Sequence, residues 1–203
     1  MTDLVGKIIN RSRNIRLQIL GTYSDFVMFF LLRIKGVSVG SKIHFWGIAY
    51  ILRYPASSIQ IGDGSSFRSD ANSNLIGINR KCILSTHSST AKIIIGKDSA
   101  FSGTVIGSKE KIIIGNNLLC GANTLITDFD WHGLDPQRRL SYSGDSKEII
   151  IGDNVFIGYG AVILKGVSIG DNTVIGANSV VTKSIPANVI AGGNPCKVIK
   201  SLQ

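Results

Sequence analysis

A hydrophobic repeat with a period of six residues constrains the fold of this chain more than any other feature. Residues 151–186 divide into the blocks IGDNVF, IGYGAV, ILKGVS, IGDNTV, IGANSV and VTKSIP, and each block begins with Ile or Val. The same phase is present upstream at Ile114, Cys120 and Ile126, with shorter fragments at Ile61 and Ile95. A period of six fits neither the turn of an α-helix nor the alternation of a long strand. The repeat therefore predicts very short strands joined by tight turns.

In such a chain, one aliphatic side chain in every block points inward and the residues after it form a corner. Gly, Asn and Asp follow most of the block-opening residues, and they readily adopt the left-handed backbone that a tight corner needs. Three blocks make one triangular coil, and each buried Ile contributes roughly 1.5–3 kcal/mol. A single coil cannot bury its apolar face, so several coils must stack. We therefore expect an all-β solenoid of parallel strands.

Residues 1–35 lack the repeat. We expect one or two amphipathic helices here, broken near Gly21, with an apolar run at residues 26–32 that is far shorter than the ~20 residues of a membrane span. Six basic residues against Asp3 and Asp25 give a net charge of 6 − 2 = +4; the six are Lys7, Arg11, Arg13, Arg16, Arg33 and Lys35. The segment either caps the first coil or attaches the chain to an anionic membrane.

Residues 36–185 form the predicted solenoid, and residues 186–203 form a short basic tail. The early coils are irregular, and we expect inward or strand positions at Val37, Val39, Ile59, Ile61, Ile93 and Ile95. Residues 128–148 interrupt the repeat with the polar insertion DFDWHGLDPQRRLSYSGDSKE, which must protrude as a loop. A loop held on a rigid framework is a favourable place for binding or catalysis.

Charge and cysteine content limit the classes of function. The formal net charge of +9 favours an anionic partner, such as coenzyme A, a nucleotide sugar, nucleic acid or an acidic lipid, without choosing between them. Cys82, Cys120 and Cys196 are an odd number with no CxxC spacing, which argues against a disulfide framework or a zinc site and indicates a reducing compartment. No secretory signal pattern is visible. We therefore expect a cytoplasmic protein, with peripheral contact to the inner face of the membrane left open.

The polar insertion contains one histidine, His132, flanked by Asp128, Asp130 and Asp135. An imidazole can accept a proton near neutral pH, and a carboxylate or carbonyl on its other nitrogen fixes the tautomer. A single histidine in a loop is more often a solvated residue. On these residues alone, a catalytic base and a solvated side chain both stay open.

Two segments resemble hexapeptide-repeat acetyltransferases. ITDFDWHGLDPQRR resembles their signature loop, and IGANSVVTKSIPANVIAGGNPCKVIK resembles the end of these enzymes that binds coenzyme A. The group includes maltose and galactoside acetyltransferases and many polysaccharide O-acetyltransferases, and the resemblance covers roughly residues 36–200. It implies a left-handed parallel β-helix, acetyl-CoA as the acyl donor and a homotrimer. The handedness comes from the resemblance alone, because parallel crossovers are otherwise nearly always right-handed.

The resemblance also implies roles for individual residues. His132 stands at the position of the general base, which takes a proton from the acceptor as the acceptor attacks the thioester. Gly158 and Tyr159 lie at the turn whose backbone N–H acts as an oxyanion donor, although the family often has Ser in place of Tyr159. Five further residues match positions that bind the pantetheine and adenine parts or the phosphates of coenzyme A: Ala177, Thr182, Lys183, Lys197 and Lys200.

The expected acceptor is a sugar hydroxyl of a glycan. We expect Asp130, Trp131 and Arg138 of the insertion to contact it, together with Ser102, which stands where maltose and galactoside enzymes often carry Asn. This departure, and the lack of their N-terminal acceptor module in residues 1–35, argue against free maltose or galactoside and favour surface-polysaccharide or glycan biosynthesis. N-acetylation of an amino sugar on a nucleotide carrier stays open, since a base assists either transfer.

Two further interpretations are weaker. A γ-class carbonic anhydrase needs three histidines converging on one metal, but His44, His87 and His132 lack the compact His-x4-His pair of that family. A non-catalytic solenoid has no need of the complete loop or of the tail that resembles a coenzyme A site. We therefore expect no metal and no nucleic acid partner.

Overall fold

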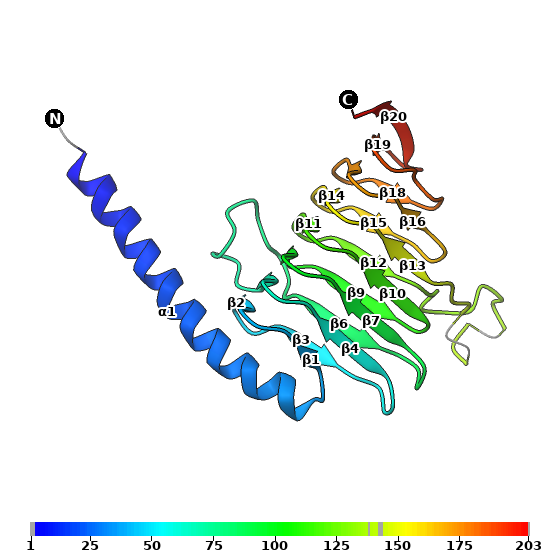
Figure 1. Cartoon of the computed structure of the whole chain (residues 1–203), viewed down its shortest axis with the longest axis horizontal. Helices are drawn as coiled ribbons and strands as arrows, with labels where there is room; N and C mark the ends of the chain where they lie inside the picture. The colour runs from blue at the N-terminus through cyan, green and yellow to red at the C-terminus, as the bar shows by residue number, and fades with distance from the viewer. Residues whose placement is uncertain (1–2, 138, 142–143, 203) are drawn as a thin grey trace.

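The structure is a computed structural model that describes residues 3–137, 139–141 and 144–202. A long N-terminal helix, α1 (Leu4–Ile34), leads into a stack of short strands arranged as three sheets (Figure 1). The chain visits the three sheets in turn, so that each coil contributes one strand to each sheet. This arrangement of parallel strands around a common core confirms the solenoid that the period of six predicts.

The three sheets have the following members. The first sheet contains β1 (Ser38–Val39), β4 (Ser58–Ile61), β7 (Lys92–Ile95), β10 (Lys111–Ile114), β13 (Ile149–Ile151) and β16 (Ser168–Ile169). The second contains β2 (His44–Trp46), β5 (Ser66–Arg68), β8 (Ala100–Ser102), β11 (Leu119–Cys120), β14 (Phe156–Ile157), β17 (Val174–Ile175), β19 (Val189–Gly192) and β20 (Lys197–Ser201). The third contains β3 (Tyr50–Leu52), β6 (Ile83–Thr86), β9 (Val105–Ser108), β12 (Leu125–Thr127), β15 (Val162–Ile163) and β18 (Val180–Val181).

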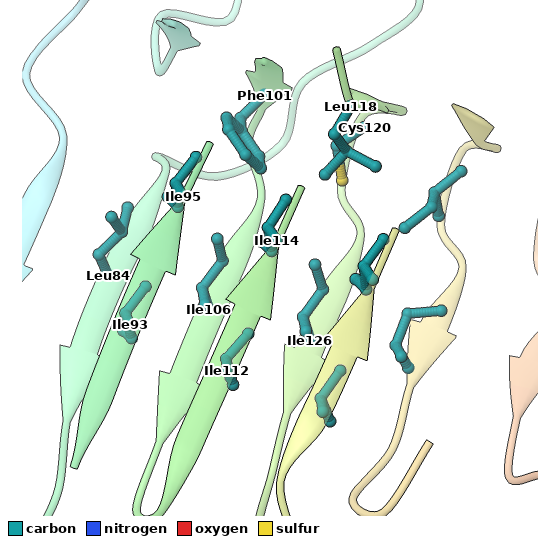
Figure 2. Packing of buried hydrophobic residues seen from close by; sticks show 14 of the residues in the cluster. Leu84, Ile93, Ile95, Phe101, Ile106, Ile112, Ile114, Leu118, Cys120 and Ile126 are labelled. Atoms are coloured by element: carbon teal, nitrogen blue, oxygen red, sulfur yellow. The ribbon is translucent and has the colours of Figure 1, made fainter. Parts of the chain in front are cut away.

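Aligned residues of successive coils form columns that run along the core. In the second sheet, the rings of Phe45, Phe67 and Phe101 stack with centroids 5.2 and 5.0 Å apart. The register continues this column through Cys120 and then through smaller aliphatic side chains to Ala191. Figure 2 shows the buried side chains of neighbouring coils lying side by side. The block-opening residues are all buried in these columns, as predicted: Ile151, Ile157, Ile163, Ile169, Ile175 and Val181.

One corner of the stack is built from asparagines. Asn117, Asn154, Asn172 and Asn188 all have positive φ angles between 56° and 59°. Their side chains form a ladder in which each amide donates to the next one, at 3.1, 3.1 and 3.0 Å. Asparagine tolerates this left-handed conformation better than most residues, and the ladder satisfies its amides. The Asn that recurs in the sequence repeat therefore stabilises the turn at this corner.

Helix α1 is continuous, so the predicted break near Gly21 is wrong. Gly21 instead allows a close approach, because a Cβ there would lie 3.3 Å from Nε1 of Trp46 in the first coil. The helix begins at an N-cap in which the Asp3 carboxylate accepts from Gly6 N–H at 2.8 Å. A single glycine in a helix costs only about 1 kcal/mol relative to alanine, and the packing against Trp46 offsets that cost.

The C-terminal half of α1 covers the first coil. Ser24, Met28 and Leu32 are buried there. The Asp25 carboxylate accepts from the backbone N–H of Phe45 at 2.6 Å and contacts Nδ1 of His44 at 3.0 Å. This half therefore acts as a cap, while the N-terminal half extends past the coils (Figure 1). By length and composition, α1 could cross a membrane, which the short apolar run in the sequence did not indicate.

The C-terminal segment is more ordered than a tail. β19 continues the second sheet in parallel with β17, and β20 folds back against β19 as an antiparallel strand. Every other strand pairing among the described residues of the three sheets is parallel. The basic residues of this segment are thus held on a strand at the far end of the stack from α1 (Figure 1).

Candidate functional site

The polar insertion between β12 and β13 is anchored by a buried carboxylate at its first residue. Asp128 is fully buried and accepts three hydrogen bonds, from the Ser108 hydroxyl at 2.7 Å and from the backbone N–H groups of Lys109 and Glu110 at 2.7 and 3.0 Å. The two ends of the insertion then pair with each other, since Lys147 N–H donates to Asp128 O at 2.8 Å. The base of the loop is therefore fixed to the coil below it.

An aromatic cluster fixes the next residues of the loop. The Trp131 ring lies 4.6 Å from that of Phe129 and 4.9 Å from that of His87, which follows β6. His87 is half-buried, and its Nε2 lies 2.9 Å from the Ser85 hydroxyl. Burial lowers the pKa of His87 against a smaller opposing effect of the Asp128 charge, which favours a neutral ring. Trp131 also lies directly over Gly107, where a Cβ would be 2.9 Å from its Cζ2.

His132 lies next to this cluster and is exposed. Its Nδ1 faces the backbone oxygen of Arg139 in the same loop, at 3.3 Å. A carbonyl oxygen can only accept, so Nδ1 carries the proton and donates to it. This tautomer leaves the lone pair of Nε2 directed away from that bond. The arrangement is the one that a general base requires, with one nitrogen held and the other free to take a proton.

The other predicted residues of the insertion have different surroundings. The Asp130 carboxylate forms an ion pair with Nζ of Lys165, which lies between β15 and β16 on the next coil. This pair ties the loop to that coil, and the contact of Asp130 with an acceptor stays a prediction. Trp131 is 44% exposed, and its contact with an acceptor also stays a prediction. Arg138 lies outside the described residues.

A second group of predicted residues gathers at the corner between the second and third sheets. The Ser102 hydroxyl is buried and accepts from the Asn74 side chain at 3.2 Å. The Tyr159 hydroxyl accepts from the Asn123 side chain at 3.1 Å, and the same amide donates to Gly77 O at 2.7 Å. Asn74 and Gly77 belong to a long loop, residues 69–82, between β5 and β6. This loop therefore packs on the corner through polar side chains.

The two groups are not brought together within one chain. His132 follows a strand of the third sheet, β12, whereas Ser102 and Tyr159 follow strands of the second sheet, β8 and β14. In Figure 1, the insertion and the loop of residues 69–82 project from opposite sides of the stack. A site that uses both groups has to be completed by a second copy of the chain.

The residues assigned to the acyl donor lie on the later coils. The Gly158 N–H donates to Ile175 O at 2.7 Å within the strand ladder, so it is not free for a ligand. None of the described backbone hydrogen bonds uses the N–H of Tyr159. Gly158 also stacks directly over Ala177, because a Cβ on Gly158 would lie 2.5 Å from Ala177 N. Four residues further along are exposed: Thr182, Lys183, Lys197 and Lys200.

The histidines do not converge on a metal site. Among the described residues, no group of three or more His, Cys, Asp or Glu side chains is placed to hold a metal ion. Each histidine has a separate partner within the chain: His44 contacts Asp25, His87 contacts Ser85, and His132 contacts Arg139. The described residues therefore offer no site of the carbonic anhydrase type within one chain.

Residues 148–183 match the model of the bacterial transferase hexapeptide family, described as six repeats. The matched segment is similar to the hexapeptide-repeat transferases. The chain is 43% identical over 92 residues to a galactoside O-acetyltransferase of Lactococcus lactis, covering 45% of this chain and 44% of the relative. The chain spans about half the length of the curated relatives it matches.

Solved structures of acyltransferases share the fold. A galactoside acetyltransferase in complex with coenzyme A is 27% identical, with a TM-score of 0.52, and the match covers 82% of this chain and 65% of that one. AntD, an N-acyltransferase of Bacillus cereus solved with dTDP and 3-hydroxybutyryl-CoA, is 22% identical, with a TM-score of 0.66 over 87% of this chain and 88% of that one. At that identity, the likeness to AntD concerns the fold alone.

Some residues around the candidate site make contacts that the sequence did not reveal. His87 and Lys165 lie 45 and 33 positions from His132, and only the stacking of coils brings them to its loop. Asn123 does not open a block, so the sequence indicates its place only weakly. In the structure it is buried at a corner, with a φ of 62°. Asn74 lies in a stretch without the repeat, so the sequence did not indicate that its side chain donates to Ser102.

Proposed function

We propose that this chain transfers an acetyl group from acetyl-CoA to a sugar hydroxyl of a glycan, with His132 as the general base. The observation that carries the proposal is the geometry of His132. Its Nδ1 is held by the Arg139 carbonyl on a loop anchored by Asp128, and Nε2 remains available. The relatives that carry names of sugar O-acetyltransferases support the class of reaction.

In this mechanism, Nε2 of His132 removes the proton of the acceptor hydroxyl as its oxygen attacks the thioester carbonyl. The C–S bond then breaks, the new ester forms, and the imidazolium returns the proton to the leaving thiolate of coenzyme A. Negative charge develops on the carbonyl oxygen before the C–S bond breaks. We propose that the Tyr159 N–H stabilises this charge, because the neighbouring Gly158 N–H is already used within the ladder.

We propose that the active site lies between two copies in a homotrimer of left-handed coils. One copy supplies His132, Trp131 and Arg138, and its neighbour supplies Ser102 and Tyr159. The support for this arrangement is that the two groups project from different corners of one chain. A head-to-tail interface of this kind uses two different faces of the subunit, and it closes into a ring of three copies when each contact turns by one third of a circle.

We propose that coenzyme A lies along the later coils, with Ala177, Thr182 and Lys183 beside its pantetheine and adenine parts. Lys197 and Lys200 are exposed on β20, where their charges would face its phosphates. The reaction would take place in the cytoplasm during surface-polysaccharide or glycan synthesis. The reduced state of Cys82, Cys120 and Cys196 agrees with that compartment.

The test is the release of free thiol from acetyl-CoA in the presence of a panel of oligosaccharides and nucleotide sugars. His132→Asn should lower kcat by about 10²–10⁴ with any accepted acceptor. The matched control is His44→Asn, which changes an exposed histidine that lies on the first coil and leaves the insertion untouched. Near-wild-type turnover by His132→Asn would refute the proposed base. Acetylation of amino sugars but not of hydroxyl acceptors would favour the N-acetyltransferase alternative.

A further inference from the structure

An apolar stripe runs along α1 on the side that faces away from the coils. Ile8, Ile15, Ile19, Phe26 and Phe30 are 47–66% exposed. Their spacings of seven and four residues place them on one side of the helix. The buried residues Ser24, Met28 and Leu32 lie on the opposite side. Nothing in the described chain covers this stripe, although it contains large aliphatic and aromatic side chains.

The charges beside the stripe are all positive along the free half of the helix. Between Leu4 and Ser24, the charged residues are Lys7, Arg11, Arg13 and Arg16, with no Asp or Glu. Arg11 and Arg16 are exposed and flank the stripe on its two sides. Cations that border an apolar face match the phosphate layer above the acyl chains of a bilayer.

The loop of residues 69–82 adds a second apolar element next to the helix. Arg13 of α1 donates to Asn72 O of this loop at 3.4 Å. A groove between them is lined by Arg13, Arg16 and Leu75, among other residues. At the tip of the loop, Leu75 and Ile76 are 78% and 59% exposed. Adjacent leucine and isoleucine side chains at a loop tip can enter the same apolar layer as a helix stripe.

We propose that α1 and the tip of the loop form a face that lies on an anionic phospholipid membrane. The helix does not cross the membrane in this arrangement, because Ser24, Asp25, Met28 and Leu32 remain engaged with the first coil. It lies in the plane of the interface, with the stripe among the acyl chains and the arginines at the headgroups. Pairing of two stripes between copies of the chain is disfavoured, because it would bring Arg11 and Arg16 of both copies together.

The experiment is vesicle flotation with the full chain. Vesicles of phosphatidylcholine alone are compared with vesicles that also contain phosphatidylglycerol, each at low and high salt. The wild type should float only with phosphatidylglycerol vesicles, and more weakly at high salt. Arg11→Gln with Arg16→Gln should weaken binding about 25-fold, at about fivefold for each arginine near the surface. Ile15→Gln with Ile19→Gln should weaken it by about tenfold or more.

The matched control is Lys42→Gln with Lys92→Gln, which removes the same charge from exposed positions on the coils. This control should bind vesicles as the wild type does. An equal loss in the control would show that only net charge matters and would overturn the proposed face. So would an absence of wild-type binding. Sedimentation without lipid completes the test: if Ile15→Gln with Ile19→Gln changed the assembly state, the stripe would be a contact between copies.

Discussion

Gly107 should control the position of the insertion that carries His132 without contributing much to stability. In Gly107→Ala, the added Cβ would lie 2.9 Å from Cζ2 of Trp131 and 3.7 Å from Cε1 of Phe129. Carbon atoms pack best at about 3.5–4.0 Å, so the indole must move by roughly 0.6–1.1 Å. The backbone of Gly107 accepts a side chain, because its φ is not among the positive values. The strain is therefore relieved by the exposed ring and not by the core.

A displacement of that size next to His132 should be costly for catalysis. Misplacement of a reacting group by about 1 Å can lower the rate by about 10²-fold, so we expect Gly107→Ala to lower kcat by about 10–100-fold. The midpoint of thermal unfolding should change little. The chain has two tryptophans, so in a Trp46→Phe background the emission of Trp131 reports its movement directly. A shift in that emission should accompany the loss of turnover.

The control is Gly21→Ala in α1, where the new Cβ also meets an indole, at 3.3 Å from Nε1 of Trp46. This substitution changes a tryptophan contact far from the insertion and should leave kcat unchanged. Wild-type kcat in Gly107→Ala, together with a shifted Trp131 emission, would refute the coupling between the aromatic cluster and His132. An unshifted emission would refute the steric argument itself.

Two further predictions concern titrating groups. Burial holds the pKa of His87 below its ordinary value of 6.5, so the unfolded chain binds this proton more tightly and the free energy of unfolding should fall as the pH drops through and below that value. His87→Gln should flatten this part of the curve of unfolding midpoint against pH, and an unchanged slope would contradict the assignment. Burial raises the pKa of the Cys120 thiol to about 11 and also raises that of Cys82, so Ellman's reagent should label both only after unfolding. Reaction of both thiols in the native chain near neutral pH would show that this part of the core opens.

The solenoid follows from the sequence because its core is periodic. The opening position of each block is buried, and Ile151 to Val181 fill it at a fixed spacing. The expectation of one inward residue per block is incomplete, because the fifth position is buried as well: Val155, Ala161, Val167, Thr173, Ser179 and Ile185. Gly21 shows the limit of the same reasoning. A glycine in a helical segment is read as a break, but here its lack of a side chain admits Trp46 from a coil 25 residues later. That contact depends on tertiary packing, which the helix propensity of residues near Gly21 cannot predict.

The candidate site could be predicted only in part for a similar reason. The sequence singled out His132 through the insertion and its resemblance to a family motif. It could not show that Asp130 pairs with Lys165, or that His87 holds Trp131, because both contacts depend on how loops fold across coils. Nor did it place Ser102 and His132 at different corners, because the blocks of the early coils are irregular and their count is interrupted there.

The two ends of the stack have consequences for solubility. A solenoid of parallel strands presents an open edge at each end, and an open edge can pair with another chain and extend into a fibre. Here α1 lies across the first coil, and the Asp25 carboxylate accepts a hydrogen bond from the backbone N–H of Phe45. At the other end, the antiparallel β20 closes the second sheet and carries Lys197 and Lys200. A truncation that removes either end should therefore expose an open edge and cause the chain to polymerise end to end.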